Sequence, residues 1–333
     1  MSTGSSPDAN GRAPKNMKTT IVMLSVDEGD LLEVSLPAAI GQADAEVLVV
    51  DNASSDSTES VVEANGAGYM RLRERVSYAA AINAGIAGSD GAGVLLLNAD
   101  CVIGEDFVEL LSDRLRDPGV GSVAPKLIRA KSIDAGDRLG VLDAAGMTID
   151  RRRKNRLVGH NEPAESYGVR GEVFGADGAA VLYRRETLEA CAIGGEVLDE
   201  DFELWAADVD LAWRAQLLGW RSCYEPAAVG WHVRYYSPST RSQLDPAHRR
   251  LQFRNRLLMI AKNETAASLR RDFHRIAFYE LLAFGHVVLR ERDLFGGYAD
   301  AVRLLPAARR RRAVIAARRA AGRRVPFGIE PPR

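Results

Sequence analysis

The sequence predicts an α/β protein with a mostly parallel central sheet flanked by helices, and with a helical extension at its C-terminus. Between residues 20 and 127, short apolar runs alternate with segments whose apolar residues recur at helical spacing. This alternation is typical of βαβ units, in which consecutive strands run parallel. The apolar runs end in acidic or amide side chains, at the edge of the sheet where α/β proteins bind ligands.

The elements follow one another at short intervals. Apolar runs predict strands at residues 20–26, 46–50, 69–72, 93–97 and 120–127. Helical spacing predicts helices at residues 31–40, 58–65, 78–87 and 105–116, a helix from residue 185, and another that ends at Gly219. No GxGxxG motif follows the first strand and no GxxxxGKS/T motif occurs, which weighs against classical dinucleotide and P-loop sites.

Composition limits the class of protein. The 333 residues are 46% hydrophobic and 27% charged, with a net charge of −1, as in a soluble globular protein. The three cysteines are widely spaced, which argues against a disulfide framework or a zinc site and favours a reducing, cytoplasmic compartment. Residues 1–17 are polar and predict a flexible segment, since they lack the apolar core of a signal peptide. No apolar run reaches the length of a transmembrane span.

The run from Leu95 to Ile103 carries the clearest chemical signal. Asn98 and Asp100 follow a buried strand with one residue between them, and on an extended chain such residues face the same side. A carboxylate and an amide oxygen are hard ligands that suit Mg²⁺ or Mn²⁺. The alternative is a strand that simply stops at a polar turn.

The segment from Leu198 to Val233 is rich in acids and aromatics. Asp208 stands at the start of the helix that ends at Gly219, where it is either an N-cap or a general base at the lip of a cleft. Asp210 points elsewhere on a helix and is expected to brace the loop. His232 follows a predicted strand and is either structural or a metal ligand.

Two further segments allow two interpretations each. The small residues around Asp177, from Gly175 to Tyr183, permit either close approach to a ligand or tight packing of strand on helix. The basic segment 151–154 predicts a solvated loop, with contact to an anionic substrate as the alternative.

The C-terminal part is helical and basic. Helices are predicted at residues 249–262, 269–289 and 298–321, and residues 301–333 hold ten Arg, no Lys and one acid. The segment can be interpreted in three ways: it caps the first domain, it forms a dimer interface, or it attaches to anionic lipid at the inner face of the plasma membrane. Nucleic acid is a weaker interpretation, because aromatic residues do not interleave with the basic run.

An ordered set of motifs resembles the family 2 glycosyltransferases of GT-A fold, which is Rossmann-like, and is most similar to their bacterial rhamnosyltransferase-like branch. The resemblance covers residues 18–240, which we take as the glycosyltransferase domain, with 241–333 as the extension. The matching pieces are residues 21–22 and 29–32, 49–54, 78–86, 95–100, 178–185, 199–202, 208–211 and 219–232.

The resemblance implies an inverting, metal-dependent transfer of a sugar from a nucleotide-sugar donor. Asp208 would be the catalytic base, while Asp100 and His232 would hold Mg²⁺ or Mn²⁺. Asp51 would contact the base of the nucleotide. The implied nucleotide-sugar-binding set is Ser25, Asp27, Asp51, Asn83, Asn98 and Asp177. The implied donor is dTDP-rhamnose or a UDP-hexose, and the acceptor is lipid-linked or a polysaccharide of the cell envelope.

The chain departs from the family at two places. The first strand ends in Ser25-Val26-Asp27-Glu28 rather than in a Tyr-Asn-type pair, and Ala207 stands where Glu is usual before the base. Two rival functions therefore stay open. A sugar nucleotidyltransferase would need a glycine-rich, basic loop after the first strand, where this chain is acidic. A catalytically weakened scaffold is favoured by Ala207 and opposed by the retained Asp51, Asp100, Asp208 and His232.

Overall fold

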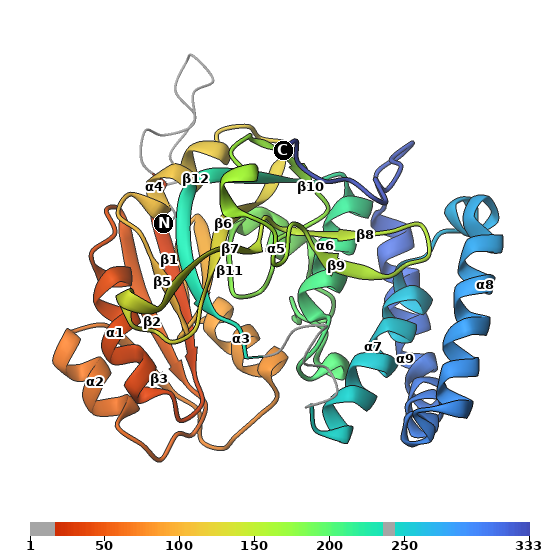
Figure 1. Cartoon of the computed structure of the whole chain (residues 1–333), viewed down its shortest axis with the longest axis horizontal. Helices are drawn as coiled ribbons and strands as arrows, with labels where there is room; N and C mark the ends of the chain where they lie inside the picture. The colour runs from red at the N-terminus through yellow and green to blue at the C-terminus, as the bar shows by residue number, and fades with distance from the viewer. Residues whose placement is uncertain (1–16, 236–243) are drawn as a thin grey trace, which may run out of the picture.

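The computed structural model describes residues 17–235 and 244–333, and it has the predicted α/β architecture with a helical region at the C-terminal end (Figure 1). Within those residues, ten strands form one sheet whose main path runs β10-β12-β6-β11-β4-β1-β2-β3. Both the predicted flexible segment, apart from Met17, and the predicted domain boundary at residue 240 lie outside the described residues. The division into two domains therefore stays a prediction.

The N-terminal half of the sheet is parallel, and its elements confirm the predicted ones to within about two residues. Its strands are β1 (Thr19–Ser25), β2 (Ala45–Asp51), β3 (Gly68–Arg71) and β4 (Gly93–Asn98). The helices that follow these strands in the chain are α1 (Gly29–Ile40), α2 (Thr58–Asn65), α3 (Tyr78–Ala87) and α4 (Phe107–Arg114).

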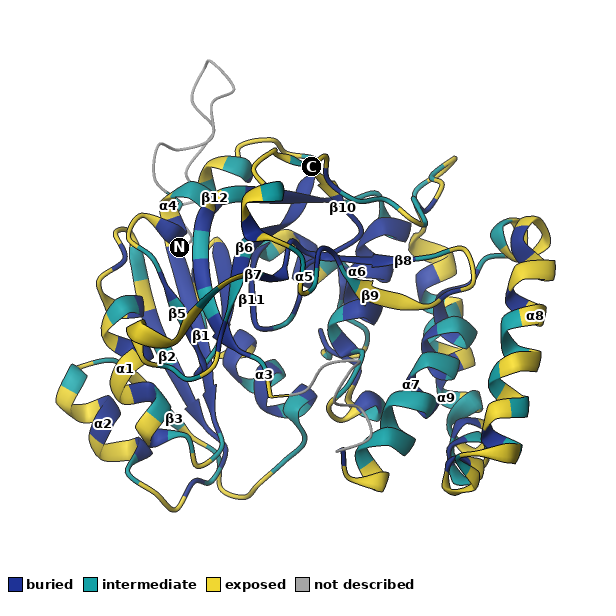
Figure 2. Cartoon of the chain, viewed as in Figure 1, coloured by how far each residue is buried: buried dark blue, intermediate teal, exposed yellow. Residues whose placement is uncertain are grey.

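Strand β1 shows how the sheet divides the core. Its successive side chains point to opposite faces, as strand geometry requires. Val22 and Leu24 pack with α3 and α6 (Ala207–Leu218) in one apolar cluster, whereas Ile21 and Met23 pack with α1 and α4 in the other. All four are buried, so the sheet is the middle layer between two sets of helices (Figure 2).

The second half of the sheet is mixed rather than parallel. Strand β11 (Ala180–Arg184) runs antiparallel to both β4 and β6 (Val120–Ala130), while the long β12 (Arg221–Val233) runs parallel to β6. The remaining strands of the sheet are antiparallel to their neighbours: β5 (Cys101–Ile103), β7 (Arg138–Ala144) and β10 (Gly171–Val173). A separate hairpin joins β8 (Met147–Ile149) and β9 (Asn155–Leu157).

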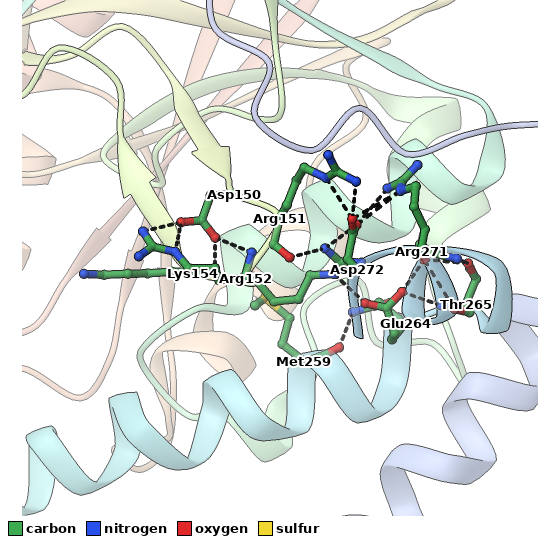
Figure 3. Close-up of polar contacts among 12 residues, drawn as sticks. Asp150, Arg151, Arg152, Lys154, Met259, Glu264, Thr265, Arg271 and Asp272 are labelled. Atoms are coloured by element: carbon green, nitrogen blue, oxygen red, sulfur yellow. Dashed lines mark hydrogen bonds and ion pairs between the residues drawn. The ribbon is translucent and has the colours of Figure 1, made fainter. Parts of the chain in front are cut away.

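The basic segment is a turn in which Arg151, Arg152 and Lys154 are exposed, so the predicted solvated loop is confirmed for these residues and wrong for Arg153. Arg153 is fully buried, where its guanidinium pairs with the carboxylates of Glu264 and Asp272. Arg151 and Arg271 also contact the Asp272 carboxylate (Figure 3). The segment also anchors α7 (Pro246–Asn263) and α8 (Ala266–Leu289) to the hairpin of β8 and β9.

The C-terminal helices join the α/β part through their inner faces. Helix α7 packs against both α9 (Phe295–Arg318) and α6, and α5 (Arg185–Cys191) packs against α6 from another side. Short 3-10 turns are η1 (Ala135–Asp137), η2 (Ala164–Ser166), η3 (Glu200–Phe202) and η5 (Arg292–Leu294). After α9 the chain returns to the core, where the ring of Phe327 lies 5.9 Å from that of Phe174 and 5.2 Å from that of Trp213.

A buried ion cluster ties α7 to α6. The Lys262 ammonium lies 2.5 Å from the carboxylate of Asp199 and 2.6 Å from that of Asp210. Asp210 also accepts from Arg214 and Asn263, which fits its expected bracing role. Burial lowers the pKa of Lys262, and the two carboxylates oppose that effect. Helix α6 is therefore fixed by charges that have no access to water.

Replacing Lys262 with Met should destabilise the protein by about 3 kcal/mol, because it leaves buried carboxylates short of a positive partner. The measurement is urea unfolding followed by circular dichroism. The matched control is Lys18→Met, whose ammonium pairs with Glu46 and Asp90 at the exposed surface and should leave the unfolding midpoint unchanged. Equal midpoints for both variants would contradict the assigned role of Lys262.

Candidate active site

A cavity of about 550 Å³ opens at the carboxyl ends of β1 and β4. Five of the predicted site residues line it: Asn98, Asp100, Asp177, Asp208 and His232. They come from β4 and the turn after it, the loop before β11, the start of α6 and the end of β12. The sheet thus brings together residues that are up to 134 positions apart in the chain.

Asp100 and His232 meet because β5 and β12 pair side by side. Strand β4 ends at Asn98, the chain turns through Ala99 and Asp100, and β5 then pairs Cys101 with His232. The Asp100 Oδ1 lies 3.3 Å from His232 Nε2. This oxygen is buried and has no hydrogen-bond partner among the described residues.

Asp143 organises the other side of His232, and sequence reasoning missed it. It lies on β7, fully buried, and its carboxylate accepts hydrogen bonds from His232 Nδ1 at 2.8 Å and from Arg234 Nε at 2.7 Å. Burial raises the pKa of Asp143, but His232 and Arg234 together hold it well below its usual range. The carboxylate therefore stays charged and fixes the orientation of both side chains.

The neighbouring carboxylates also set the charge of His232. Burial lowers its pKa, but the contacts with Asp100 and Asp143 outweigh this effect and raise the pKa to about 9. With Nδ1 held by Asp143, Nε2 is the ring nitrogen that faces Asp100 and the cavity. Histidines that bind metals commonly donate their second ring N–H to a carboxylate in this way.

The donor atoms fit a divalent cation. Ligand atoms of Asp143, Asp177 and His232 all lie within 4.8 Å of one another. However, the Arg234 guanidinium donates to both Asp143 and Asp177, so those two carboxylates already have a positive partner. Asp100 Oδ1 and His232 Nε2 face each other, and with no cation bound the protonated ring pairs with Asp100. A cation that took the place of the Nε2 proton would gain one hard oxygen and one imidazole nitrogen.

Asp208 lies across the cavity at the second residue of α6. The N-cap position belongs to Ala206, in the left-handed region at φ 65°, so the N-cap interpretation of Asp208 is wrong. The Asp208 carboxylate accepts from the backbone N–H of Gly178 at 3.2 Å and of Val209 at 2.8 Å. Burial and the nearby Asp177 raise its pKa to about 6, which suits a group that takes a proton near neutral pH.

Three predicted residues form a polar cluster beside the cavity rather than in its lining. The Asp51 carboxylate is buried and accepts from Tyr69 and Arg71 at 2.6 and 2.9 Å. Asp27 pairs with Arg75 at 2.6 Å, and Arg75 itself lines the cavity. Ser25 is buried 2.9 Å from the hydroxyl of Thr58.

Asn83 is not brought to the cavity. Its amide donates to the carbonyl oxygen of Leu198 and accepts from the Leu198 backbone N–H, at 2.9 and 2.8 Å. The side chain thus fixes the loop before η3. Its place in a helix full of alanines could not reveal this partner, which lies 115 residues away.

Glu28 lines the cavity and was also missed. Burial and the nearby Asp100 raise its pKa to about 7. The sequence shows that two acids follow β1, but it does not show which of them faces the cavity. Asp27 adopts φ 57° and turns toward Arg75, which leaves Glu28 on the cavity side.

Comparison with protein families finds one match. The model described as glycosyl transferase family 2 matches residues 20–190, which include β1 to α5. Those residues carry Asp100, Asp143 and Asp177, whereas Asp208 and His232 lie beyond the matched segment.

A curated relative and two solved structures are also similar to this chain. Poly-β-1,6-N-acetyl-D-glucosamine synthase of Staphylococcus aureus is 24% identical over 221 residues, covering 64% of this chain and 49% of the relative. The chain thus spans about half the length of the curated relatives it matches.

Two solved structures have similar folds. TarS of S. aureus in complex with UDP-GlcNAc has a TM-score of 0.58 at 15% identity, over 91% of this chain and 89% of TarS. The mannosyltransferase PcManGT of Pyrobaculum calidifontis, in complex with GDP-Man and Mn²⁺, has a TM-score of 0.52 at 19% identity, over 91% and 86%.

Proposed function

The chain belongs to glycosyl transferase family 2, and from this premise we propose that it transfers a sugar from a nucleoside diphosphate to an acceptor hydroxyl, with inversion at the anomeric carbon. One observation carries the proposal. A single cavity is lined by Asp208, a carboxylate with a raised pKa, and by Asp100 and His232, which lie 3.3 Å apart and which we propose as the cation-binding pair. Such an arrangement can activate a hydroxyl on one side and hold a diphosphate on the other.

Asp208 is the proposed general base. The backbone N–H groups of Gly178 and Val209 fix its carboxylate, and the cavity wall limits its contact with water. It would take the proton of the acceptor hydroxyl as that oxygen attacks the anomeric carbon, on the face opposite the diphosphate. The C–O bond to the diphosphate breaks and the new glycosidic bond forms with inverted configuration.

Asp100 and His232 are the proposed ligands of Mg²⁺ or Mn²⁺. When bound, the cation would offset the negative charge that develops on the leaving diphosphate. In support, Asp100 Oδ1 lies 3.3 Å from His232 Nε2 at the cavity, and Asp143 orients the ring. PcManGT, of similar fold, was solved with Mn²⁺.

The nucleotide is proposed to lie along the ends of β1, β2 and β4. We keep Asp51 as the contact for its base, with Ser25 and Asp27 beside it, and Asn98 and Asp177 nearer the sugar. Arg71 and Arg75 pair with Asp51 and Asp27 at this edge, and Arg75 also lines the cavity, where its guanidinium could contact a diphosphate. For Asn83, its contacts with Leu198 favour a positioning role.

The donor is proposed to be dTDP-rhamnose, with a UDP-hexose as the alternative, and the acceptor a lipid-linked or polysaccharide glycan of the cell envelope. The rhamnose assignment depends on the motif resemblance. The similar proteins carry other sugars in their descriptions, namely UDP-GlcNAc for TarS and GDP-Man for PcManGT. A panel of nucleotide sugars, assayed for hydrolysis with and without Mn²⁺, separates these donors.

The rival functions have weaker support. A nucleotidyltransferase needs a basic, glycine-rich loop after β1, and here that loop carries Asp27 and Glu28. A weakened scaffold is suggested by Ala207, which is buried against the core where the family usually has Glu. Peripheral membrane contact and a homodimer also stay proposals. Among the described residues, no helix is both long and apolar enough to cross a bilayer.

Replacing Asp208 with Asn should lower turnover of the preferred donor at least about a hundredfold, because the amide cannot accept the acceptor proton. Nucleotide affinity, measured by calorimetry, should stay within about twofold, since Asn keeps the size of the side chain. The control is Asp113→Asn on α4, an exposed acid paired with Arg116. A scaffold would show no turnover in either form, and near-normal turnover of Asp208→Asn would exclude this residue as the base.

Activity should also depend on pH through Asp208. Because its pKa is about 6, the carboxylate is charged above that pH and protonated below it. The value of kcat/KM should therefore fall about tenfold for each pH unit below 6 and level off above 7. The measurement is an initial-rate profile from pH 4.5 to 8 at saturating Mn²⁺. A profile that stays flat down to pH 5 would contradict the assignment.

A further inference from the structure

Helix α8 is the outermost helix of the C-terminal region (Figure 1). Its inner side is fixed by the buried Ile276 and Val287 and by Asp272, whose carboxylate receives the arginines of segment 151–153. Its outer side is exposed along most of its length (Figure 2). The helix is therefore anchored on one side and open on the other.

The open side carries an apolar stripe. Phe278, Leu281, Leu282 and Leu289, which we call the α8 stripe, are 63%, 67%, 57% and 75% exposed. Spacings of three, four and seven residues place them on one face of the helix, within about 100° of arc. Single exposed apolar residues are common in proteins, but a row of large ones on one face marks a contact surface.

Basic residues extend the same face toward the start of α8. Arg271, His274 and Arg275 precede Phe278 at helical spacing, and Arg270 lies at their flank. The exposed ionisable residues of α8 are all basic: Arg270, Arg271, His274, Arg275 and His286. The two acids of the helix are used internally, since Asp272 is buried and Glu280 pairs with Arg256.

This chain offers no evident cover for the stripe. The undescribed segments 1–16 and 236–243 contain no Leu, Ile, Val or Phe. A second copy joined by two-fold symmetry would either set the basic starts of two α8 helices against each other or, if the helices ran antiparallel, set each basic start against an apolar stripe. Neither arrangement gives the arginines an anionic partner. An anionic lipid bilayer matches both parts of this face, because its interior is apolar like the α8 stripe and its headgroups carry the charge opposite to that of the arginines.

We propose that α8 docks the protein on an anionic lipid bilayer. The α8 stripe would enter the boundary between headgroups and acyl chains, while Arg270 and Arg275 would contact headgroup phosphates. The helix would lie in the plane of the interface rather than cross it. This inference stands on the surface of α8 alone, so its outcome and that of the proposed transferase activity are independent.

The test is co-sedimentation of the full chain with vesicles, either of phosphatidylcholine alone or with about a third of phosphatidylglycerol. The wild type should bind the anionic vesicles, and 1 M salt should weaken that binding. Leu281→Glu with Leu282→Glu should lower the partition coefficient at least about tenfold. Arg270→Gln with Arg275→Gln should lower it about 25-fold, since each arginine contributes about a factor of five.

The matched control is Val34→Glu with Val169→Glu, which adds the same charges at residues that are 40% and 46% exposed elsewhere. It should bind like the wild type, and donor hydrolysis without vesicles should be equal in all four proteins. The proposal is overturned if the wild type leaves anionic vesicles unbound or if the stripe variant binds normally. It is also overturned if light scattering shows that the stripe variant is a monomer while the other three proteins are dimers, because the stripe then contacts a second copy of the chain.

Discussion

The candidate site depends on one buried charge, the carboxylate of Asp143. It holds His232 through Nδ1 and Arg234 through its guanidinium, and Arg234 in turn reaches Asp177. A buried carboxylate is costly unless it is paired, so these partners are necessary for the fold as well as useful for the site. The same pairing turns His232 Nε2 toward Asp100 Oδ1, where we propose that a cation replaces the proton of the ring. Asp143 and Asp177 thus hold the structure through Arg234, whereas Asp100 is the carboxylate that we propose for binding the cation.

The proposed base, Asp208, is held in place by a second buried cluster, to which the C-terminal helices contribute Lys262. Lys262 on α7 contacts Asp199 and Asp210, and these flank the start of α6 on which Asp208 stands. The helical region thus fixes the position of helix α6, which carries the proposed base. This arrangement explains why Asp208 and Asp210, only two residues apart, have different surroundings. Asp210 is fixed among cations, whereas Asp208 faces the cavity with a pKa raised to about 6.

The sequence was most informative where periodicity is strong. Strands β1 to β4 and their helices could be predicted because each buries a continuous apolar run or an apolar stripe. Strands β7 to β10 could not, because β7 has no continuous apolar run and β8, β9 and β10 have only three residues each. Asp143 lies in such a strand, so nothing local distinguished it from an acid in a turn. The burial of Arg153 in the basic segment was missed for a related reason: the acids that pair with it, Glu264 and Asp272, follow more than 100 residues later.

The most direct test of this account is the position of the metal. Crystals soaked with Mn²⁺ and a nucleoside diphosphate, with data collected near the manganese absorption edge, locate the ion by its anomalous signal. We expect one peak bonded to Asp100 and to His232 Nε2, with Arg234 still bound to Asp143. A peak between Asp143 and Asp177, with Arg234 displaced, would contradict the assigned division between structural and metal-binding carboxylates. No peak in a nucleotide-bound crystal would contradict the metal site itself.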